Sequence, residues 1–200
     1  MHILFLGPPC PTVEAYFSAK GHSFARTEEA LSLAWVREQG FDFGLSYRYN
    51  NVIRQDIIDY FAGKLINMHI SFLPWNRGSD PNLWSYIDDT PKGVTIHRVD
   101  AGIDTGDILL QQEIDIDLQT DTLRTSYDKL SCAVEKLFIN NAEALLANAI
   151  PAEPQTGAGS FHYAKDTLPF VHLIAESGFD TQLSEIINSL RGGALQGGKK

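Results

Sequence analysis

The pattern of apolar and polar positions in the first third of the chain predicts alternating strands and helices. Short apolar runs bounded by turn residues are typical of buried strands, and apolar positions at helical spacing indicate amphipathic helices. The predicted strands cover residues 2–6, 22–26, 41–47 and 65–69, and the predicted helices cover residues 12–20, 28–39 and 52–61. This alternation predicts an α/β fold with a Rossmann-like open, mostly parallel sheet and helices on both faces.

The chain beyond residue 69 departs from this alternation. Residues 70–91 contain three prolines, two tryptophans and a single helix signal at residues 82–88, so we expect a long functional loop there. The remaining predicted elements are strands at residues 92–99 and 107–114, a long helix at residues 121–149, an extended piece at residues 161–164 and a helix at residues 182–190. Asp115, Asp117 and Asp121 are expected in a solvated turn where the long helix begins.

These elements predict one main domain over residues 1–150. A short C-terminal extension is expected over residues 151–191, because Pro151 and Pro154 end the long helix. The glycine- and lysine-rich residues 192–200 predict a disordered tail.

Composition and charge exclude several classes of function. Lys and Arg number 16 against 25 Asp and Glu, which gives a net charge of −9, so no basic face is available for nucleic acid. The apolar runs are far shorter than the about 20 residues that span a bilayer, so no membrane segment is expected. Cys10 and Cys132 have no metal-ligand spacing and are expected to be reduced thiols of a cytoplasmic protein.

Three polar residues are candidates for chemistry. Asn67 and His69 flank one residue at the end of a predicted strand, and this spacing puts both side chains on the same face. Asp104 lies in the turn between the two later strands. A histidine can move a proton, an aspartate beside it fixes its tautomer, and an asparagine amide can donate to an oxyanion. Each motif alone is typical of an ordinary strand end or turn, but together they suit acyl transfer to an amine.

These residues belong to a longer block that resembles the formyltransferases that use 10-formyltetrahydrofolate. That family includes methionyl-tRNA formyltransferase, glycinamide ribonucleotide transformylase, nucleotide-sugar N-formyltransferases and formylation domains of peptide synthetases. The block runs from residue 65 to residue 113 and repeats the family motifs in order. The matching residues are Asn67, His69, Ser71, Phe72-Leu73-Pro74, Arg77-Gly78, Gly93-Val94-Thr95 and Asp104-Thr105-Gly106. The resemblance implies the formyltransferase fold, with residues 1–150 as the catalytic domain and a short C-terminal appendage.

The resemblance also implies which residues carry the reaction. The family's catalytic residues correspond to Asn67, His69 and Asp104, and the acceptor amine is expected to attack the formyl group of 10-formyltetrahydrofolate directly, without a metal. Asn67 and His69 are then expected to stabilise the oxyanion. The pterin ring of the donor is expected against two loops, whose residues are Tyr49, Asn50, Asn51, Val52, Ile53, Asp100 and Ile103. Asn50 and Asn51 replace the glycine or arginine usual in the family, so the side-chain contacts there are expected to differ.

A nucleotide-linked amino sugar is the acceptor that the resemblance favours. Its phosphates need local positive charge against the net charge of −9, and Arg77 is the candidate, with a structural role in the loop as the alternative. Trp75 and Trp84 are candidates for walls of the acceptor site, and anchoring of the loop is the alternative for both. His97 precedes the Asp104 turn and either lines the site or is a buried structural histidine.

Two other functions stay open. One keeps the chemistry but formylates an aminoacyl group on a carrier protein of a non-ribosomal peptide synthetase. The other is a folate-binding or formyl-folate hydrolase relative that transfers nothing to an amine. Transfer RNA is not expected as acceptor, because of the acidic charge and because no β-barrel is predicted after the long helix. The expected partner is a small-molecule amine, and a homodimer stays open as an assembly.

Overall fold

The computed structural model describes residues 1–174 and 176–196, with side chains up to residue 191. It divides into two compact units, and the chain passes between them several times. The first unit comprises residues 1–69, 95–111 and 134–156, and the second comprises residues 70–94, 112–133 and the chain from residue 157 onward. The division expected at residue 150 therefore does not coincide with the boundary between the units, and a separate extension over residues 151–191 stays a prediction.

The first unit begins with the alternation that the sequence predicts. Its elements are β1 (His2–Leu6), α1 (Pro11–Ala19), β2 (Ser23–Thr27), α2 (Leu33–Gln39), β3 (Phe43–Tyr47), α3 (Gln55–Phe61) and β4 (Leu65–His69). Strand β1 pairs in parallel with both β2 and β3, and β3 pairs in parallel with β4. The structure thus confirms a mostly parallel sheet.

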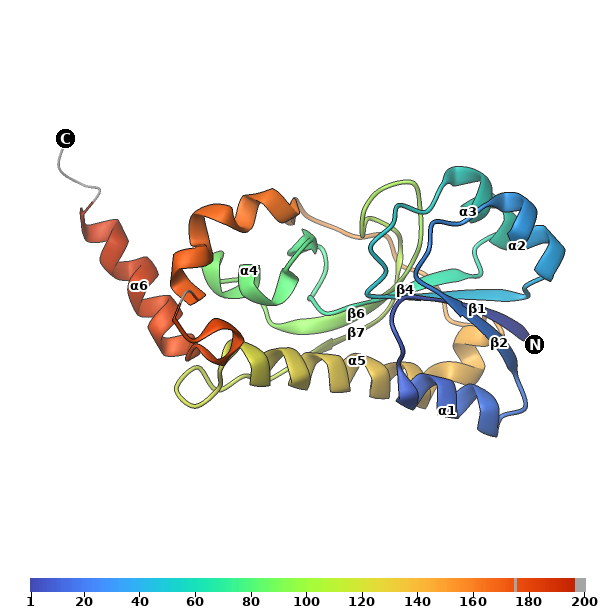
Figure 1. Cartoon of the computed structure of the whole chain (residues 1–200), viewed down its shortest axis with the longest axis horizontal. Coiled ribbons are helices and arrows are strands. Elements are labelled where there is room, and N and C mark those ends of the chain that lie inside the picture. The colour runs from blue at the N-terminus through green and yellow to red at the C-terminus, as the bar shows by residue number, and fades with distance from the viewer. Residues whose placement is uncertain (175, 197–200) are drawn as a thin grey trace. The chain divides into compact units, whose positions relative to one another are not determined.

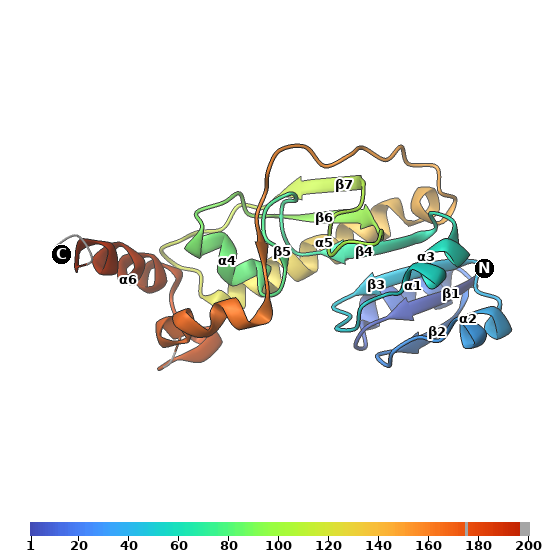
Figure 2. The same ribbon diagram turned by 90° about the horizontal axis from the view of Figure 1, so that it is seen from above.

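Two further strands complete this sheet with a change of direction. β6 (Gly93–Arg98) pairs antiparallel with β4, and β7 (Ile108–Glu113) lies at the edge beyond it. Figure 2 shows the six strands side by side in the order β2-β1-β3-β4-β6-β7. Because β6 is antiparallel to β4, the chain leaves β6 at the end of the sheet where β4 begins.

Helices cover both faces of the sheet in the first unit (Figure 1). Helix α1 and the later part of α5 (Leu123–Leu146) lie on one face, where the rings of Phe17 and Phe138 meet at a centroid distance of 6.0 Å. On the other face, helices α2 and α3 bury their apolar side chains against strands β1 and β4. The residues of that core are Leu4, Leu6, Val36, Phe41, Ile57, Phe61 and Leu65. Strand β1 is buried on both faces, as expected for a covered parallel strand.

The second unit has its own core. A short parallel pair joins β5 (Arg77–Gly78) to β8 (Phe161–His162). The helices are α4 (Pro81–Ile87), the start of α5, the 3-10 helices η1 (Ala164–Ile174) and η2 (Gly178–Asp180), and α6 (Leu183–Gln196). Their buried apolar side chains are Leu83, Tyr86, Leu123, Leu173, Leu183 and Ile186. The sequence did not predict η1.

Two helices begin later than the sequence predicts. The helix expected from residue 28 begins at Leu33, because the Ser32 hydroxyl accepts from the amide of Trp35 and caps it (3.3 Å). The helix expected from residue 52 begins at Gln55, after the extended backbone of Arg54. In both places, residues that the pattern assigned to a helix form a loop instead.

The structure differs from the predictions for Asp121 and for the start of the predicted tail. Asp121 does not lie in a solvated turn: it is 5% exposed and joins the start of α5 to the start of α6, since Leu183 N donates to its carbonyl oxygen (3.0 Å). The tail expected to be disordered from residue 192 is helical up to Gln196, because α6 packs into the second core through Leu183 and Ile186 and continues from there. Residues 197–200, the rest of that predicted tail, lie outside the described residues. No helix in the described part of the chain is long and apolar enough to cross a membrane.

Candidate active site

Three polar side chains share one face of the sheet in the first unit. Asn67 and His69 alternate with Met68 along β4, so both point to the same side. Across the strand pair, Asn67 stands directly opposite His97 of β6. Residues directly opposite on an antiparallel pair also project to the same side. Sheet register therefore brings an amide and two imidazoles together.

The Asp104 loop folds back over this face. Val99 N donates to Leu65 O (2.9 Å), which fixes the start of the loop beside the beginning of β4. Asp104 itself adopts a left-handed backbone conformation with φ of 55°, which is costly for a residue other than glycine. Its carboxylate then reaches Asn67, whose Nδ2 lies 3.1 Å from Asp104 Oδ1.

The predicted trio is therefore brought together, with His97 as a fourth member. His69 Nδ1 lies 3.7 Å from Asp104 Oδ2, and His97 Nε2 lies 3.5 Å from Asp104 Oδ1. Asn67 Nδ2 also lies 3.2 Å from His97 Nε2. One carboxylate thus stands between two imidazoles and an amide. The 3.7 Å separation is longer than a hydrogen bond, and such contacts commonly tighten when substrate binds.

The hydrogen bonds fix how the neutral His97 ring carries its proton. His97 Nδ1 lies 2.8 Å from Arg98 O, and a carbonyl oxygen can only accept, so Nδ1 is the donor. His97 Nε2 is then an acceptor, and Asn67 Nδ2 donates to it. Both amide hydrogens of Asn67 are engaged, one with His97 and one with Asp104. For Asn67 to donate to a substrate oxygen, one of these hydrogens must change its acceptor.

Burial makes this cluster electrostatically strong. His69 is 7% exposed and His97 is 2% exposed, while Asp104 is half-buried. Interactions between polar groups strengthen where water is largely excluded. Within the described residues, no group of three or more His, Cys, Asp or Glu side chains is arranged to hold a metal ion.

The first loop predicted to hold folate is tied to the neighbouring segment by its side chains. Tyr49 OH donates to Glu29 O (2.6 Å), and Asn51 Nδ2 donates to Glu28 O (2.7 Å). Burial raises the pKa of Tyr49, which keeps its hydroxyl a donor. The amide of Asn51 therefore binds the chain's own backbone, whereas the Val52 side chain is 79% exposed.

The second predicted folate loop is built around Asp100. Its Oδ1 accepts from Gly102 N (3.1 Å) and from Thr105 Oγ1 (2.7 Å), so this carboxylate shapes the turn. Ile103 stands between them with 47% of its surface exposed. A Cβ at Gly106 would collide with the carbonyl oxygen of Arg98, so only glycine allows the loop to close here.

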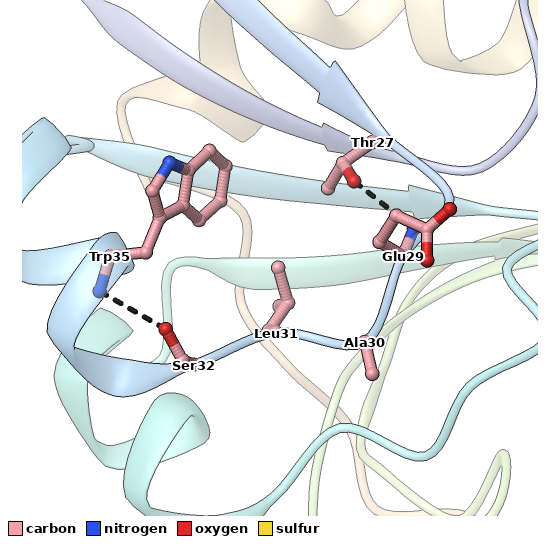
Figure 3. Close-up of a pocket in the computed structure, with 6 residues that line it drawn as sticks. All are labelled: Thr27, Glu29, Ala30, Leu31, Ser32 and Trp35. Atoms are coloured by element: carbon pink, nitrogen blue, oxygen red, sulfur yellow. Dashed lines mark hydrogen bonds between the residues drawn. The ribbon is translucent and has the colours of Figure 1, made fainter.

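A small cavity lies along the segment that joins the end of β2 to the start of α2 (Figure 3). Its volume is about 170 Å³, and it is lined by Thr27, Glu29, Ala30, Leu31, Ser32 and Trp35. None of the predicted site residues lines it. Its wall is connected to the first loop through the Tyr49–Glu29 hydrogen bond.

The residues predicted to bind the acceptor belong to the second unit. Trp84 of α4 is 5% exposed, and its ring is stacked on His162 at a centroid distance of 3.7 Å. These contacts of Trp84 fit anchoring of the loop better than a wall of the acceptor site. Trp75 and Arg77 are half-buried, and the backbone of Arg77 is fixed by a hydrogen bond from its N–H to Ser160 O (3.0 Å).

Sequence reasoning left His97 undecided and did not identify its role. The missing information was the register that places His97 opposite Asn67, because sequence pattern gives strand positions but not their pairing. His97 is a buried, hydrogen-bonded histidine, as one of the two alternatives had it. It also belongs to the polar cluster formed by Asn67, His69, His97 and Asp104.

An open α/β sheet with an Asn-His-Asp cluster on one face has the groups that acyl transfer to an amine requires, and comparison with known proteins shows the family. Residues 11–141 match the sequence profile of the formyl transferase family, and the chain belongs to that family. Methionyl-tRNA formyltransferase of Thermodesulfovibrio yellowstonii is 35% identical over 117 residues, which are 58% of this chain and 38% of that protein. The chain spans less than half the length of such curated relatives.

Solved structures extend the likeness over almost the whole chain. The formyltransferase PseJ from Anoxybacillus kamchatkensis, in complex with UDP-4,6-dideoxy-4-formamido-L-AltNAc and tetrahydrofolate, superposes with a TM-score of 0.90 at 37% identity. That match covers 95% of this chain and 100% of PseJ. A sugar N-formyltransferase from Shewanella sp. shares the fold, with a TM-score of 0.75 at 19% identity over 94% of this chain and 86% of that one.

Proposed function

We propose that this protein transfers a formyl group from 10-formyltetrahydrofolate to the primary amine of a nucleotide-linked amino sugar. The observation that carries the proposal is the similarity to PseJ, which extends over nearly all of both chains and whose structure contains a UDP-linked formamido sugar and tetrahydrofolate. The acidic net charge of −9 also disfavours a transfer RNA acceptor. Two free cysteines are consistent with the reducing cytoplasm as its compartment.

The polar cluster supplies the groups that formyl transfer needs. The acceptor amine loses a proton as its nitrogen bonds the formyl carbon, and the tetrahydrofolate nitrogen that leaves that carbon gains one. His69 is the group placed to receive the first proton and to return it to the leaving nitrogen. Because His69 Nδ1 faces Asp104 at 3.7 Å, proton transfer is assigned to Nε2. Asp104 stabilises the positive ring that forms and holds its orientation.

Asn67 is the candidate for stabilising the negative charge that develops on the formyl oxygen. Its amide nitrogen already donates to Asp104 Oδ1 and to His97 Nε2. We propose that the substrate oxygen takes the place of His97 Nε2 as acceptor of one amide hydrogen, through a small shift of the planar amide that keeps its hydrogen bond to Asp104. A preorganised donor of this kind is worth about 10²–10³ in kcat.

The two predicted folate loops fit a flat aromatic ligand. The Val52 and Ile103 side chains are exposed apolar groups, one from each loop, and covering them would remove apolar surface from water. Hydrogen bonding to the pterin is assigned to backbone groups, since the Tyr49 and Asn51 side chains bind Glu29 and Glu28. When bound, 10-formyltetrahydrofolate supplies the activated formyl group.

Formyl transfer assays test this proposal. Purified protein is incubated with 10-formyltetrahydrofolate and a panel of UDP- and dTDP-linked amino sugars, and product is detected by mass. Formylated nucleotide-sugar that is absent with Asp104→Asn supports the proposal. Formylation of a carrier-bound aminoacyl group instead, or release of formate without any acceptor, would replace it with one of the two alternatives.

A variant in the second unit tests recognition of the acceptor phosphates. If Arg77 pairs with phosphate, Arg77→Lys should raise the KM for the nucleotide-sugar strongly, because a two-pronged guanidinium is replaced by a single charge. The KM for the folate should change little. Equal effects on both constants, or a lower melting temperature with unchanged kinetics, would assign Arg77 a structural role.

A further inference from the structure

One side chain from outside the family motifs holds the Asp104 loop. Gln155 follows α5 in a short extended segment of the first unit. Its Nε2 donates to Asp104 O and to Gly106 O, both at 2.8 Å. One amide nitrogen therefore binds the two carbonyl groups that flank Thr105, and one of these carbonyls belongs to Asp104 itself.

The segment that carries Gln155 is itself fixed to the same part of the sheet. Ile108 N donates to Glu153 O (2.8 Å), and Glu153 N donates to Ile108 O (2.9 Å). Ile108 begins β7, immediately after the Asp104 loop. Pro154, between Glu153 and Gln155, restricts the backbone of this segment. Gln155 thus approaches the loop from a rigid support.

The loop needs such support because its geometry is strained. Asp104 holds φ at 55°, a conformation that costs a non-glycine residue about 1–3 kcal/mol. The carbonyl groups of Asp104 and Gly106 are the backbone atoms whose orientation this conformation sets. If they turn, the carboxylate of Asp104 moves away from Asn67 and His69.

We propose that Gln155 is a positioning residue, which holds the Asp104 carboxylate in reach of Asn67 and His69 by binding the carbonyls of Asp104 and Gly106. This inference rests on the proposed function, since it assigns Gln155 a part in the same site. It acts through Asp104 and touches no substrate. The amide is required because the role needs two N–H donors on one nitrogen, which neither a carboxylate nor a thioether provides.

Steady-state kinetics of two near-isosteric variants test the proposal. Gln155→Met removes both donors and should lower kcat by about 10- to 100-fold with little change in either KM, because displacing a catalytic group by about 1 Å can cost 10²-fold. Gln155→Glu should be pH-dependent. Its carboxylate repels the two carbonyl oxygens, whereas its protonated form donates to one of them. An ordinary glutamate has a pKa of about 4.3, and the two facing carbonyl oxygens favour its protonated form and raise that pKa. The ratio of the kcat of Gln155→Glu to that of the wild type should therefore fall as pH rises from 5 to 8, while the ratio for Gln155→Met stays level.

Gln111→Met is the matched control. Gln111 is also a half-buried glutamine of the first unit, and its Nε2 donates to the Thr95 hydroxyl (3.0 Å). The control should keep kcat within about two-fold, because this hydrogen bond joins Gln111 to Thr95 of β6 and not to the carbonyls of Asp104 and Gly106. Equal losses in the control and in Gln155→Met, or wild-type kcat in Gln155→Met, would overturn the proposal.

Hydrogen exchange gives a readout that does not depend on the acceptor. Amides of residues 100–107 should exchange faster in Gln155→Met than in the wild type, while those of β1 and β3 are unchanged. If no acceptor is turned over by the wild-type protein, the proposed function fails while the exchange result still decides the role of Gln155. Unchanged exchange in residues 100–107 would overturn it.

Discussion

Asn67 and His97 face each other in register across β4 and β6, with Asn67 Nδ2 3.2 Å from His97 Nε2. Because His97 Nδ1 is bound to Arg98 O, this contact also determines which way the Asn67 amide is turned. The second amide hydrogen then points to Asp104. Backbone geometry at β6 thus controls the orientation of a candidate catalytic group on β4.

The first prediction concerns the tautomer of His97. In the neutral ring the proton should be on Nδ1, because only a donor can face the Arg98 carbonyl at 2.8 Å. Long-range ¹H–¹⁵N correlation spectra at pH 8 should show a protonated Nδ1 and an unprotonated Nε2. A proton on Nε2 would mean that the Asn67 amide is turned, with its oxygen toward His97.

The second prediction concerns the polar cluster. His69→Asn and Asp104→Asn should each lower kcat by at least about 10²-fold, the usual loss for a positioned acid–base group. The fold should persist, which circular dichroism and the melting temperature can check. Wild-type turnover in either folded variant would contradict the assignment of the cluster.

The third prediction concerns the folate loops. Val52→Ser and Ile103→Ser should each weaken tetrahydrofolate binding by about 5- to 10-fold, because each removes apolar surface that the ligand would cover. Stability should change by less than about 0.5 kcal/mol, since both side chains are exposed in the free protein.

Calorimetric titration measures both affinities, and Leu168→Ser is the control. Leu168 is 66% exposed on η1 of the second unit and lies on neither loop. The same loss of affinity in the control would show that the effect on tetrahydrofolate binding is not specific to these two loops. Unchanged affinity in both loop variants would place the folate elsewhere.

The fourth prediction concerns stability and pH. Burial by itself raises the pKa of Asp121, but hydrogen bonds from Lys129 Nζ (2.6 Å) and Thr125 Oγ1 (2.9 Å) outweigh it and hold the pKa below 3.8. A carboxylate whose pKa is lower in the folded state stabilises the fold above the unfolded pKa. That stabilisation is lost as pH falls through the folded pKa.

Asp121→Asn should therefore lower the free energy of unfolding at pH 7 by about 1–3 kcal/mol. The difference from the wild type should shrink below about pH 4. Urea unfolding at pH 7, 5 and 3 measures it. Asp128→Asn, an exposed carboxylate on the same helix, is the control and should change stability by less than about 0.5 kcal/mol. A difference that is constant over this pH range would show that Asp121 acts by its shape alone.

The fifth prediction concerns the two cysteines. Burial, with Glu135 nearby, raises the pKa of Cys10 to about 11, while Cys132 is exposed. A thiol reagent at pH 8 should therefore label Cys132 within minutes and Cys10 only after unfolding, because the thiolate is the reactive form. Rapid labelling of both thiols in the native protein would show that the α1 terminus opens readily.

The sequence predicted the order and type of the first seven elements because each is a short, strongly periodic segment with clear turn residues. The start of α2 was missed, since Ala30 and Leu31 continue the helical pattern although Ser32 caps the helix, whereas its end at Gln39 was predicted. Periodicity records which residues are apolar, and it does not record where a backbone amide finds its partner.

The candidate cluster was predictable in part. Asn67 and His69 could be placed on one face by spacing alone, and Asp104 was a candidate by its place in a turn. The resemblance to formyltransferases implied that the three act together. His97 and Gln155 could not be assigned, because their roles depend on strand register and on a contact across 51 positions of the chain. Asp121 was predicted to be solvated because its junction with Leu183 joins residues that are also far apart in the sequence.

The interleaving of the two units restricts how the protein can be divided by genetic engineering. Four of the five crossing points follow the last residue of β4 or fall within β6, β7 and α5, and the fifth follows Thr156. Cutting the gene at any of the three inner points, within β6, β7 or α5, leaves neither product with a whole unit. Either half expressed separately should therefore aggregate, and a split reporter built on this fold would need its break in an exposed turn such as Gly21.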